Sequence, residues 1–104
     1  MRQQLDLLVT QHDMINRTFA CFWETFDSYL QEEPQECAKI GFTSRASVKP
    51  VLYGYVFGTS TDLAFDFIKV YLDIFVNGES VRAGDYWRIY NLQGEAFDDA
   101  FIIF

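Results

Sequence analysis

The stretch at residues 68–90, IKVYLDIFVNGESVRAGDYWRIY, decides the fold that this sequence predicts. Two runs rich in β-branched and aromatic residues flank Asn77-Gly78, and such runs are typical of strands. Asn-Gly is the strongest short hairpin signal, because both central positions of a type I′ turn require a positive φ. We therefore predict two antiparallel strands, over residues 64–76 and 80–91, joined by a two-residue turn.

A two-residue turn also fixes how the two strands pair, because it places Val76 opposite Glu79. Counting back from that pair, Asp73 faces Arg82, and we expect these two side chains to form an ion pair. Tyr71 then faces Gly84. A bulge at Gly84 would shift the later pairs by one residue.

A third strand is predicted over residues 95–104, after the turn LQG at residues 92–94. A three-residue loop places Arg88 opposite Asp98, whereas a two-residue loop places it opposite Asp99. Arg88 therefore meets a carboxylate in either register.

A fourth strand is predicted over residues 51–57, VLYGYVF, where Gly54 is expected to mark a bend or a close approach of another backbone. The segment GTST at residues 58–61 should then turn the chain.

The predicted register gives the sheet two different faces. One face is aliphatic and should pack on a helix; it carries Ile68, Val70, Leu72, Ile74, Val76, Val81, Trp87 and Ile89. The other is aromatic and charged; it carries Phe65, Phe67, Tyr71, Phe75, Tyr86 and Tyr90 around Lys69, Asp73, Arg82 and Arg88. The second face is too apolar for open water, so we expect a subunit, a ligand or a partner protein to cover it.

The first third of the chain has the apolar spacing of an amphipathic helix. Apolar positions and His12 recur every three or four residues from Leu5 to Tyr29, and Pro34 should end the pattern. We favour one helix, kinked near Thr10; the alternative is that Thr10 caps a second helix beginning at residue 11. Residues 34–50 are polar and read mostly as loop, with a short edge strand at IGFT, residues 40–43.

These elements predict an α+β fold in one domain covering residues 1–104, with a long N-terminal amphipathic helix packed on a curved four-stranded antiparallel sheet. This arrangement is similar in outline to cystatin-like and NTF2-like folds, whose sheets can enclose an apolar pocket. The likeness is architectural and does not fix a function.

Composition narrows the classes of function. The 104 residues carry a net charge of −7, which argues against nucleic acid as a partner because phosphate binding needs a cationic surface. The sequence contains no metal-ligand cluster and no cofactor-binding motif, so we expect neither a bound metal nor a cofactor. The N-terminal segment lacks the features of a signal peptide or a membrane span, and the two cysteines, Cys21 and Cys37, read as reduced thiols. We expect a cytoplasmic protein.

Two hypotheses about function follow. The first is a small, acidic, non-enzymatic interaction protein that forms a homodimer through the aromatic sheet face and can also bind a basic protein partner. Its interface candidates are Phe65, Phe67, Phe75, Tyr86 and Tyr90. The alternative is a small-molecule-binding domain, or a minor enzyme, with an apolar pocket between helix and sheet. Its pocket candidates are His12, Tyr53, Tyr71, Trp87 and Arg88. We favour the first, because polar groups suited to catalysis are few.

Overall fold

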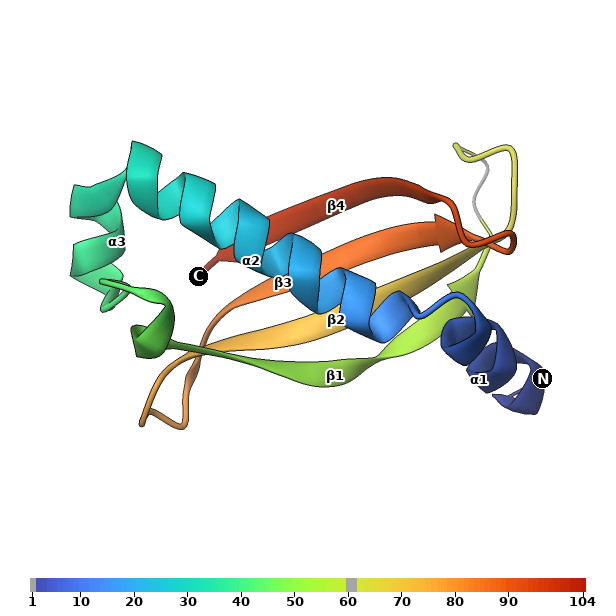
Figure 1. Cartoon of the computed structure of the whole chain (residues 1–104), viewed down its shortest axis with the longest axis horizontal. Helices are drawn as coiled ribbons and strands as arrows, with labels where there is room; N and C mark the ends of the chain where they lie inside the picture. Colours follow the sequence, from blue (N-terminus) through green and yellow to red (C-terminus); the bar gives the residue numbers. More distant parts are fainter. Residues whose placement is uncertain (1, 60–61) are drawn as a thin grey trace.

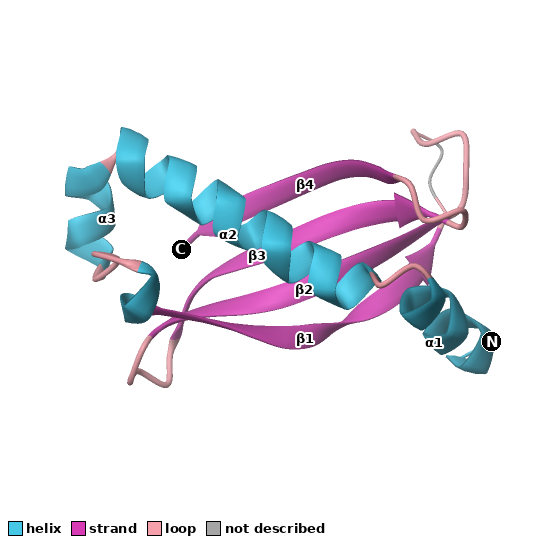
Figure 2. Cartoon of the chain, viewed as in Figure 1, coloured by secondary structure: helices cyan, strands magenta, loops and turns pink. Residues whose placement is uncertain are grey.

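The computed structural model describes residues 2–59 and 62–104, and it contains three α-helices and one four-stranded antiparallel sheet in the order β1-β2-β3-β4. The helices are α1 (Arg2–Gln11), α2 (Met14–Glu32) and α3 (Pro34–Ile40), followed by a 3-10 turn (Arg45–Ser47). The strands are β1 (Val48–Gly58), β2 (Phe67–Val76), β3 (Arg82–Asn91) and β4 (Ala96–Ile103). Helix α2 runs diagonally across one face of the sheet (Figures 1 and 2), so the predicted α+β class is confirmed.

The N-terminal helix is broken in two, so the favoured prediction of one helix kinked near Thr10 is wrong. The alternative of a second helix is nearer to the structure, although α2 begins at Met14 and not at residue 11. Asp13 adopts a left-handed conformation, with φ 51°, between the end of α1 and the start of α2. Asp tolerates this conformation better than most residues, because its short polar side chain can form local hydrogen bonds. Its carboxylate accepts a hydrogen bond from the Asn16 amide at 2.9 Å. The break turns α1 away from α2 and directs it toward the end of β1 (Figure 1).

The segment after α2 is more regular than predicted. Pro34 ends α2 at Glu32, as expected, but it also starts α3, where it occupies the first turn and needs no N–H. Gly41 ends α3 with φ 106°. Cys37 of α3 is fully buried. The predicted edge strand at residues 40–43 does not form. Residues 60 and 61 of the predicted turn at 58–61 lie outside the described residues.

The turn at Asn77-Gly78 forms, but not with the predicted geometry. The Glu79 N–H donates to the Val76 carbonyl at 3.0 Å, and Gly78 has φ 90°, whereas Asn77 keeps a negative φ. A positive φ at the second central position alone is the mark of a type II turn. The 3-10 turn holds Asn77 from the other side: the Asn77 N–H donates to the Ser47 carbonyl at 2.8 Å.

The strand register is three residues away from the predicted one. Ile74 pairs with Gly84, Phe75 pairs with Arg82, and Ala83 is the extra residue of a bulge between these pairs. Because side chains alternate along a strand, an odd shift moves every β3 side chain beyond the bulge to the opposite face. Trp87, Ile89 and Arg88 were therefore predicted on the wrong face.

Tyr86 and Tyr90 were also predicted on the wrong face. Both are fully buried on the helix side of the sheet, paired with Leu72 and Ile68.

The second turn has the predicted three-residue loop, because the Asn91 N–H donates to the Glu95 carbonyl at 2.8 Å and Gly94 has φ 85°. A bulge at Phe97 then shifts Arg88 from Asp98, the partner that this loop predicts, to Asp99.

The core lies between the helices and one face of the sheet. Phe22 and Phe26 of α2 are fully buried, and the Phe22 ring packs edge-to-face on Tyr86 at 5.7 Å between ring centres. Val9 of α1 packs in a second buried cluster with Ile68, and α3 contributes Cys37 to the first. Within the described ranges, all three helices therefore pack on the same face of the sheet.

Candidate functional site

The face of the sheet away from the helices, which we call the open face, carries a row of aromatic side chains. Tyr53 of β1 is 74% exposed, and its ring meets Tyr71 of β2 edge-to-face at 6.4 Å. Lys69 lies between two rings, with its Nζ 5.0 Å from the centre of Tyr71 and 4.2 Å from that of Trp87 on β3. Cation–π contacts of this kind hold the ammonium group over the rings. The row therefore spans three strands.

A charged cluster beside this row consists of two carboxylates that share one guanidinium group. Asp73 of β2 and Asp85 of β3 lie directly opposite each other, and both contact the guanidinium group of Arg82. The Arg82 Nη1 atom lies 3.2 Å from the Asp73 carboxylate and 2.5 Å from that of Asp85. The same guanidinium group lies 4.9 Å from the centre of the Phe104 ring. The centre of the open face therefore carries paired charges.

Aliphatic and aromatic side chains surround these groups. Val51 is 38% exposed, Val56 47% and Ile102 45%, whereas Phe67 and Phe75 are half-buried. All five side chains extend from the sheet with none of the described helices over them. Contiguous apolar area of this kind is uncommon on monomeric proteins unless it binds something.

The helix side of the same sheet holds a buried polar system that contacts no open-face residue. The Tyr86 hydroxyl donates to an Asp99 carboxylate oxygen at 2.5 Å. Burial raises the pKa of Tyr86 well above its ordinary value, and the bond to Asp99 raises it further. Arg88 contacts the Cys21 sulfur of α2 through its Nη1 atom. These groups satisfy one another beneath α2.

The structure separates the five residues predicted to line a pocket. Tyr53, Tyr71 and Trp87 come together on the open face, whereas Arg88 lies under α2. His12 lies at the junction of α1 and α2, against the turn between β3 and β4: a side chain at Gly94 would touch its imidazole ring.

Arg17 fixes this junction, because its Nη1 atom donates to the Gly94 carbonyl at 2.8 Å and to the His12 carbonyl at 3.1 Å. The surroundings of His12 are therefore those of a structural contact between a helix break and a turn.

The interface candidates also divide into two groups. Phe67 and Phe75 lie on the open face, and Phe65, just before β2, stacks on Phe97 at 4.4 Å between ring centres. Tyr86 and Tyr90 are buried, and the Tyr90 hydroxyl lies 2.8 Å from the Thr18 hydroxyl of α2. These two tyrosines belong to the core.

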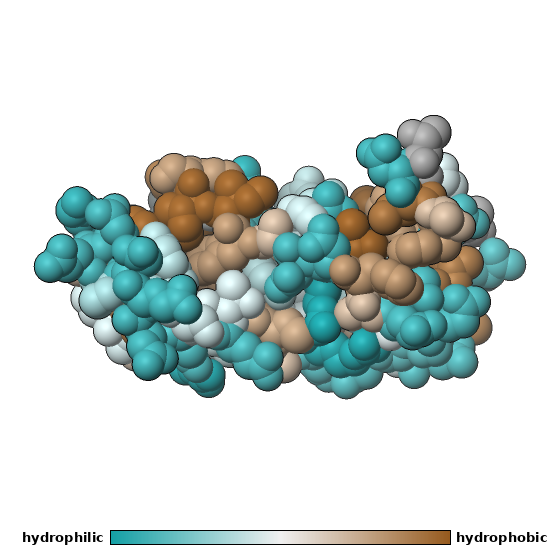
Figure 3. All heavy atoms as spheres, turned by 90° about the horizontal axis from the view of Figure 1, so that it is seen from above, coloured by the Kyte–Doolittle hydropathy of each residue, from teal (hydrophilic) through white to brown (hydrophobic). Residues whose placement is uncertain are grey.

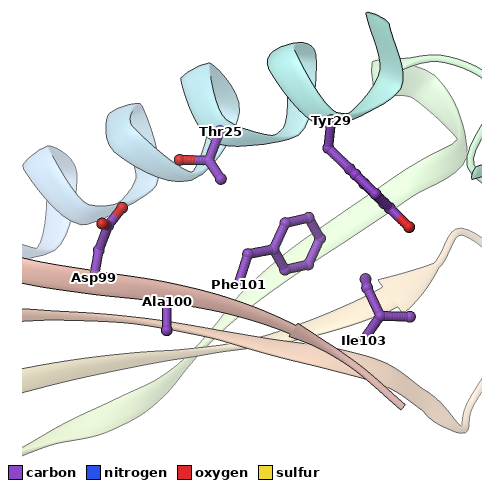
Figure 4. A pocket seen from close by; sticks show the side chains of 6 residues that line it. All are labelled: Thr25, Tyr29, Asp99, Ala100, Phe101 and Ile103. Atoms are coloured by element: carbon purple, nitrogen blue, oxygen red, sulfur yellow. The ribbon is translucent and has the colours of Figure 1, made fainter. Parts of the chain in front are cut away.

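The sequence did not predict a cleft of about 420 Å³ between α2 and β4. Its lining residues are Thr25, Tyr29, Asp99, Ala100, Phe101 and Ile103. Thr25 and Tyr29 point from the helix toward β4, and the Asp99 side chain points back toward the helix (Figure 4). Burial raises the pKa of Tyr29, and the nearby Cys37, Glu36 and Glu33 raise it further. A polar end and an apolar end thus share one cleft.

A second hollow of about 370 Å³ lies between α1 and β1. Its lining includes Asp6, which accepts a hydrogen bond from the Tyr55 hydroxyl. This bond fixes α1 on the edge of the sheet. In the described part of the chain, no group of three or more His, Cys, Asp or Glu side chains is placed to hold a metal ion. None of the helices there combines the length and the apolar character needed to cross a membrane.

Comparison with protein-family models, with curated proteins and with solved structures finds no match to this chain. The cystatin-like or NTF2-like outline and the curvature of the sheet stay predictions.

Proposed function

We propose that this protein is a non-enzymatic interaction module that forms a homodimer through the open face of its sheet. The observation that carries the proposal is the row formed by Tyr53, Tyr71, Lys69 and Trp87, which lies on a face without a covering helix in the described residues. Aromatic side chains of this kind dominate the energetics of protein interfaces because they bury a large area with few rotatable bonds.

Charge favours a second copy as the occupant of the open face. Two chains that each carry a net charge of −7 repel each other, so they associate best where the local charge is balanced. The two central strands meet this condition, with Lys69 held on aromatic rings and Arg82 held between Asp73 and Asp85. The formal charges of Lys69, Arg82, Asp73 and Asp85 sum to zero, so the burial of these four groups against an identical face adds no net charge to the interface.

The size of the open face fits a dimer interface. Four strands of eight to eleven residues present roughly 600 Å² in projection, given about 3.3 Å per residue and about 4.8 Å between strands. Protruding side chains make the accessible area larger than this projection. A standard interface buries about 800 Å² on each partner, so the open face is of the required order.

Light scattering coupled to size exclusion tests the proposal. We expect a mass twice the 12.1 kDa of one chain, and a single-chain mass for Tyr53→Asp, which replaces the most exposed ring of the aromatic row by a carboxylate. Leu7→Asp is the matched control, because Leu7 is 65% exposed on α1 and lies away from the open face. A native protein that stays at 12.1 kDa at high concentration would refute the proposal.

The cytoplasmic location belongs to the same proposal. Both cysteines are free thiols in the structure, which supports a reducing compartment.

A small-molecule-binding domain is the second candidate function, and the cleft between α2 and β4 favours it. Its volume of about 420 Å³ falls within the range of small-molecule sites. However, the cleft opens along the edge of the sheet, whereas such sites usually enclose most of their ligand. None of the five residues predicted to line a pocket contributes to it.

A further inference from the structure

The free edge of β4 has backbone groups that point away from the sheet. The Phe104 N–H donates to the Ala83 carbonyl at 3.0 Å, and in an antiparallel ladder the residues that bond inward alternate with those that do not. With Ile103 paired to Gly84, residues 99, 101 and 103 direct their N–H and C=O groups outward. The Asp99 N–H is already bonded to the Asp98 carboxylate at 2.9 Å. The outward N–H groups at Phe101 and Ile103 face the free edge.

The same three residues place their side chains in the cleft beside α2. Asp99, Phe101 and Ile103 line it from the strand, and Thr25 and Tyr29 line it from the helix (Figure 4). A strand added beside β4 would present alternate side chains to the same side of the sheet. Backbone pairing and side-chain recognition are therefore available at one place, as in strand-addition complexes.

Strand β1, at the other edge of the sheet, is protected against pairing with another chain, whereas β4 is not. Strand β1 carries Lys49 and Pro50 and has a bulge at Tyr53, three features that discourage pairing with another chain. Over residues 98–103, β4 contains neither a lysine nor a proline. Its only charges are those of Asp98 and Asp99.

These two carboxylates determine the kind of strand that fits. Both are exposed, and neither takes part in the four ion pairs found among the described residues. They point to opposite sides of the sheet: Asp99 accepts the Tyr86 hydrogen bond on the helix side, and Asp98 lies on the other side. From the β4 side, a hydrophilic strip separates two hydrophobic areas (Figure 3), which agrees with the order Phe97, Asp98-Asp99 and then Phe101–Phe104 along the strand. A second copy of β4 would bring more carboxylates to the strip, whereas a cationic segment would neutralise it.

We propose that β4 and α2 form a docking site for an extended segment of a basic partner protein. The segment pairs with β4 as a fifth strand. Because side chains alternate along a strand, it places an apolar side chain in the cleft next to Phe101 and a lysine or arginine on the opposite side of the sheet, beside Asp98. The segment docks along the free edge of β4 and not on the aromatic row of the open face, so the proposal does not depend on the homodimer.

A peptide-binding experiment tests the proposal with a defined probe. The probe is an acetylated, fluorescent eight-residue peptide of alternating lysine and valine, and fluorescence anisotropy measures its binding to the monomeric Tyr53→Asp variant at low salt. One control peptide replaces lysine with glutamate. A second keeps the lysines but is N-methylated at every backbone amide, which removes the N–H donors from both of its edges and preserves charge.

We expect the lysine peptide to bind and both control peptides to fail. In the variant Asp98→Asn, binding weakens by about fivefold, because one exposed charge pair contributes up to ~1 kcal/mol. The matched control Glu79→Gln removes an exposed charge from the far hairpin and leaves binding within about twofold. NMR shift changes should centre on the amides of Phe101 and Ile103.

Three outcomes would overturn the proposal: absence of binding, equal binding of the N-methylated peptide, or shift changes that centre on the open face. None of these outcomes bears on the open-face homodimer, because the Tyr53→Asp variant used in the binding experiment is monomeric.

Discussion

Asp73 and Asp85 face each other directly across β2 and β3, and the guanidinium group of Arg82 contacts both carboxylates. Two carboxylates directly opposite each other repel unless a cation lies between them. Arg82 therefore compensates a repulsion that the strand register creates at the centre of the open face.

Loss of this cation should destabilise the hairpin. Arg82→Gln leaves the two carboxylates without their shared partner, and we expect the free energy of unfolding to fall by about 1 kcal/mol. The loss should shrink in high salt, where the repulsion is screened. Urea unfolding measures it, with Lys39→Gln as control, because Lys39 forms only an exposed pair with Glu36. Equal effects of the two substitutions would contradict this role for Arg82.

Gly84 is predicted to be intolerant of a side chain. A Cβ atom at this position would lie 2.3 Å from the Ile102 carbonyl oxygen of β4, so Gly84→Ala forces two paired strands apart. We expect a loss of about 2–3 kcal/mol in the free energy of unfolding. Gly54→Ala is the matched control, because a Cβ atom added there would meet nothing within 4 Å, and its effect should be small. If both variants unfold at the same urea concentration, the close approach of β4 is wrong.

Tyr86 should make stability depend on alkaline pH. Its pKa is raised in the folded chain, so the folded state keeps its proton where the unfolded state loses it. The stabilisation is therefore fully present below the ordinary tyrosine pKa of about 10 and is lost as the pH rises above it, by ~1.4 kcal/mol for each pH unit.

Urea unfolding between pH 9 and pH 11 measures this slope, and Tyr86→Phe should reduce it. An identical slope in native protein and Tyr86→Phe would show that the hydroxyl is not buried as described.

The contact of Arg17 with the β3–β4 turn should hold α1 in place. Arg17→Met keeps the length of the side chain but loses the bonds to the Gly94 and His12 carbonyls. We expect hydrogen exchange in α1 to become faster while exchange in β2 stays slow, because α1 then opens without global unfolding. Uniform acceleration across both elements would argue against a local role for Arg17.

The sequence predicted where the hairpin turns, but it could not fix the register. Asn77 is held by Ser47, which precedes it by thirty residues, and the bulge at Ala83 depends on the approach of β4 to Gly84. Neither contact can be read from local spacing. The contact between Asp73 and Arg82 was nevertheless predicted correctly, because the long arginine side chain reaches Asp73 from a neighbouring position on β3.

The open face was predicted correctly for β2 but not for β3, because only the assignment of β3 depends on the register. The alternation within β2 correctly places Phe67, Tyr71 and Phe75 opposite the aliphatic residues, and the burial of that strand alternates accordingly. The contribution of β3 was inverted, since it depends on register. The cleft beside β4 was missed because it depends on where α2 crosses the sheet, which no periodicity reports.

Trp87 gives the most direct test of the central claim that the open face is buried in a homodimer. In the Trp23→Phe variant, Trp87 is the remaining tryptophan and reports on this face alone. On dilution from the concentration at which light scattering shows a dimer, we predict that its emission moves to longer wavelength as the mass halves. Emission that stays constant while the mass falls, or a mass that never exceeds that of one chain, would contradict the claim.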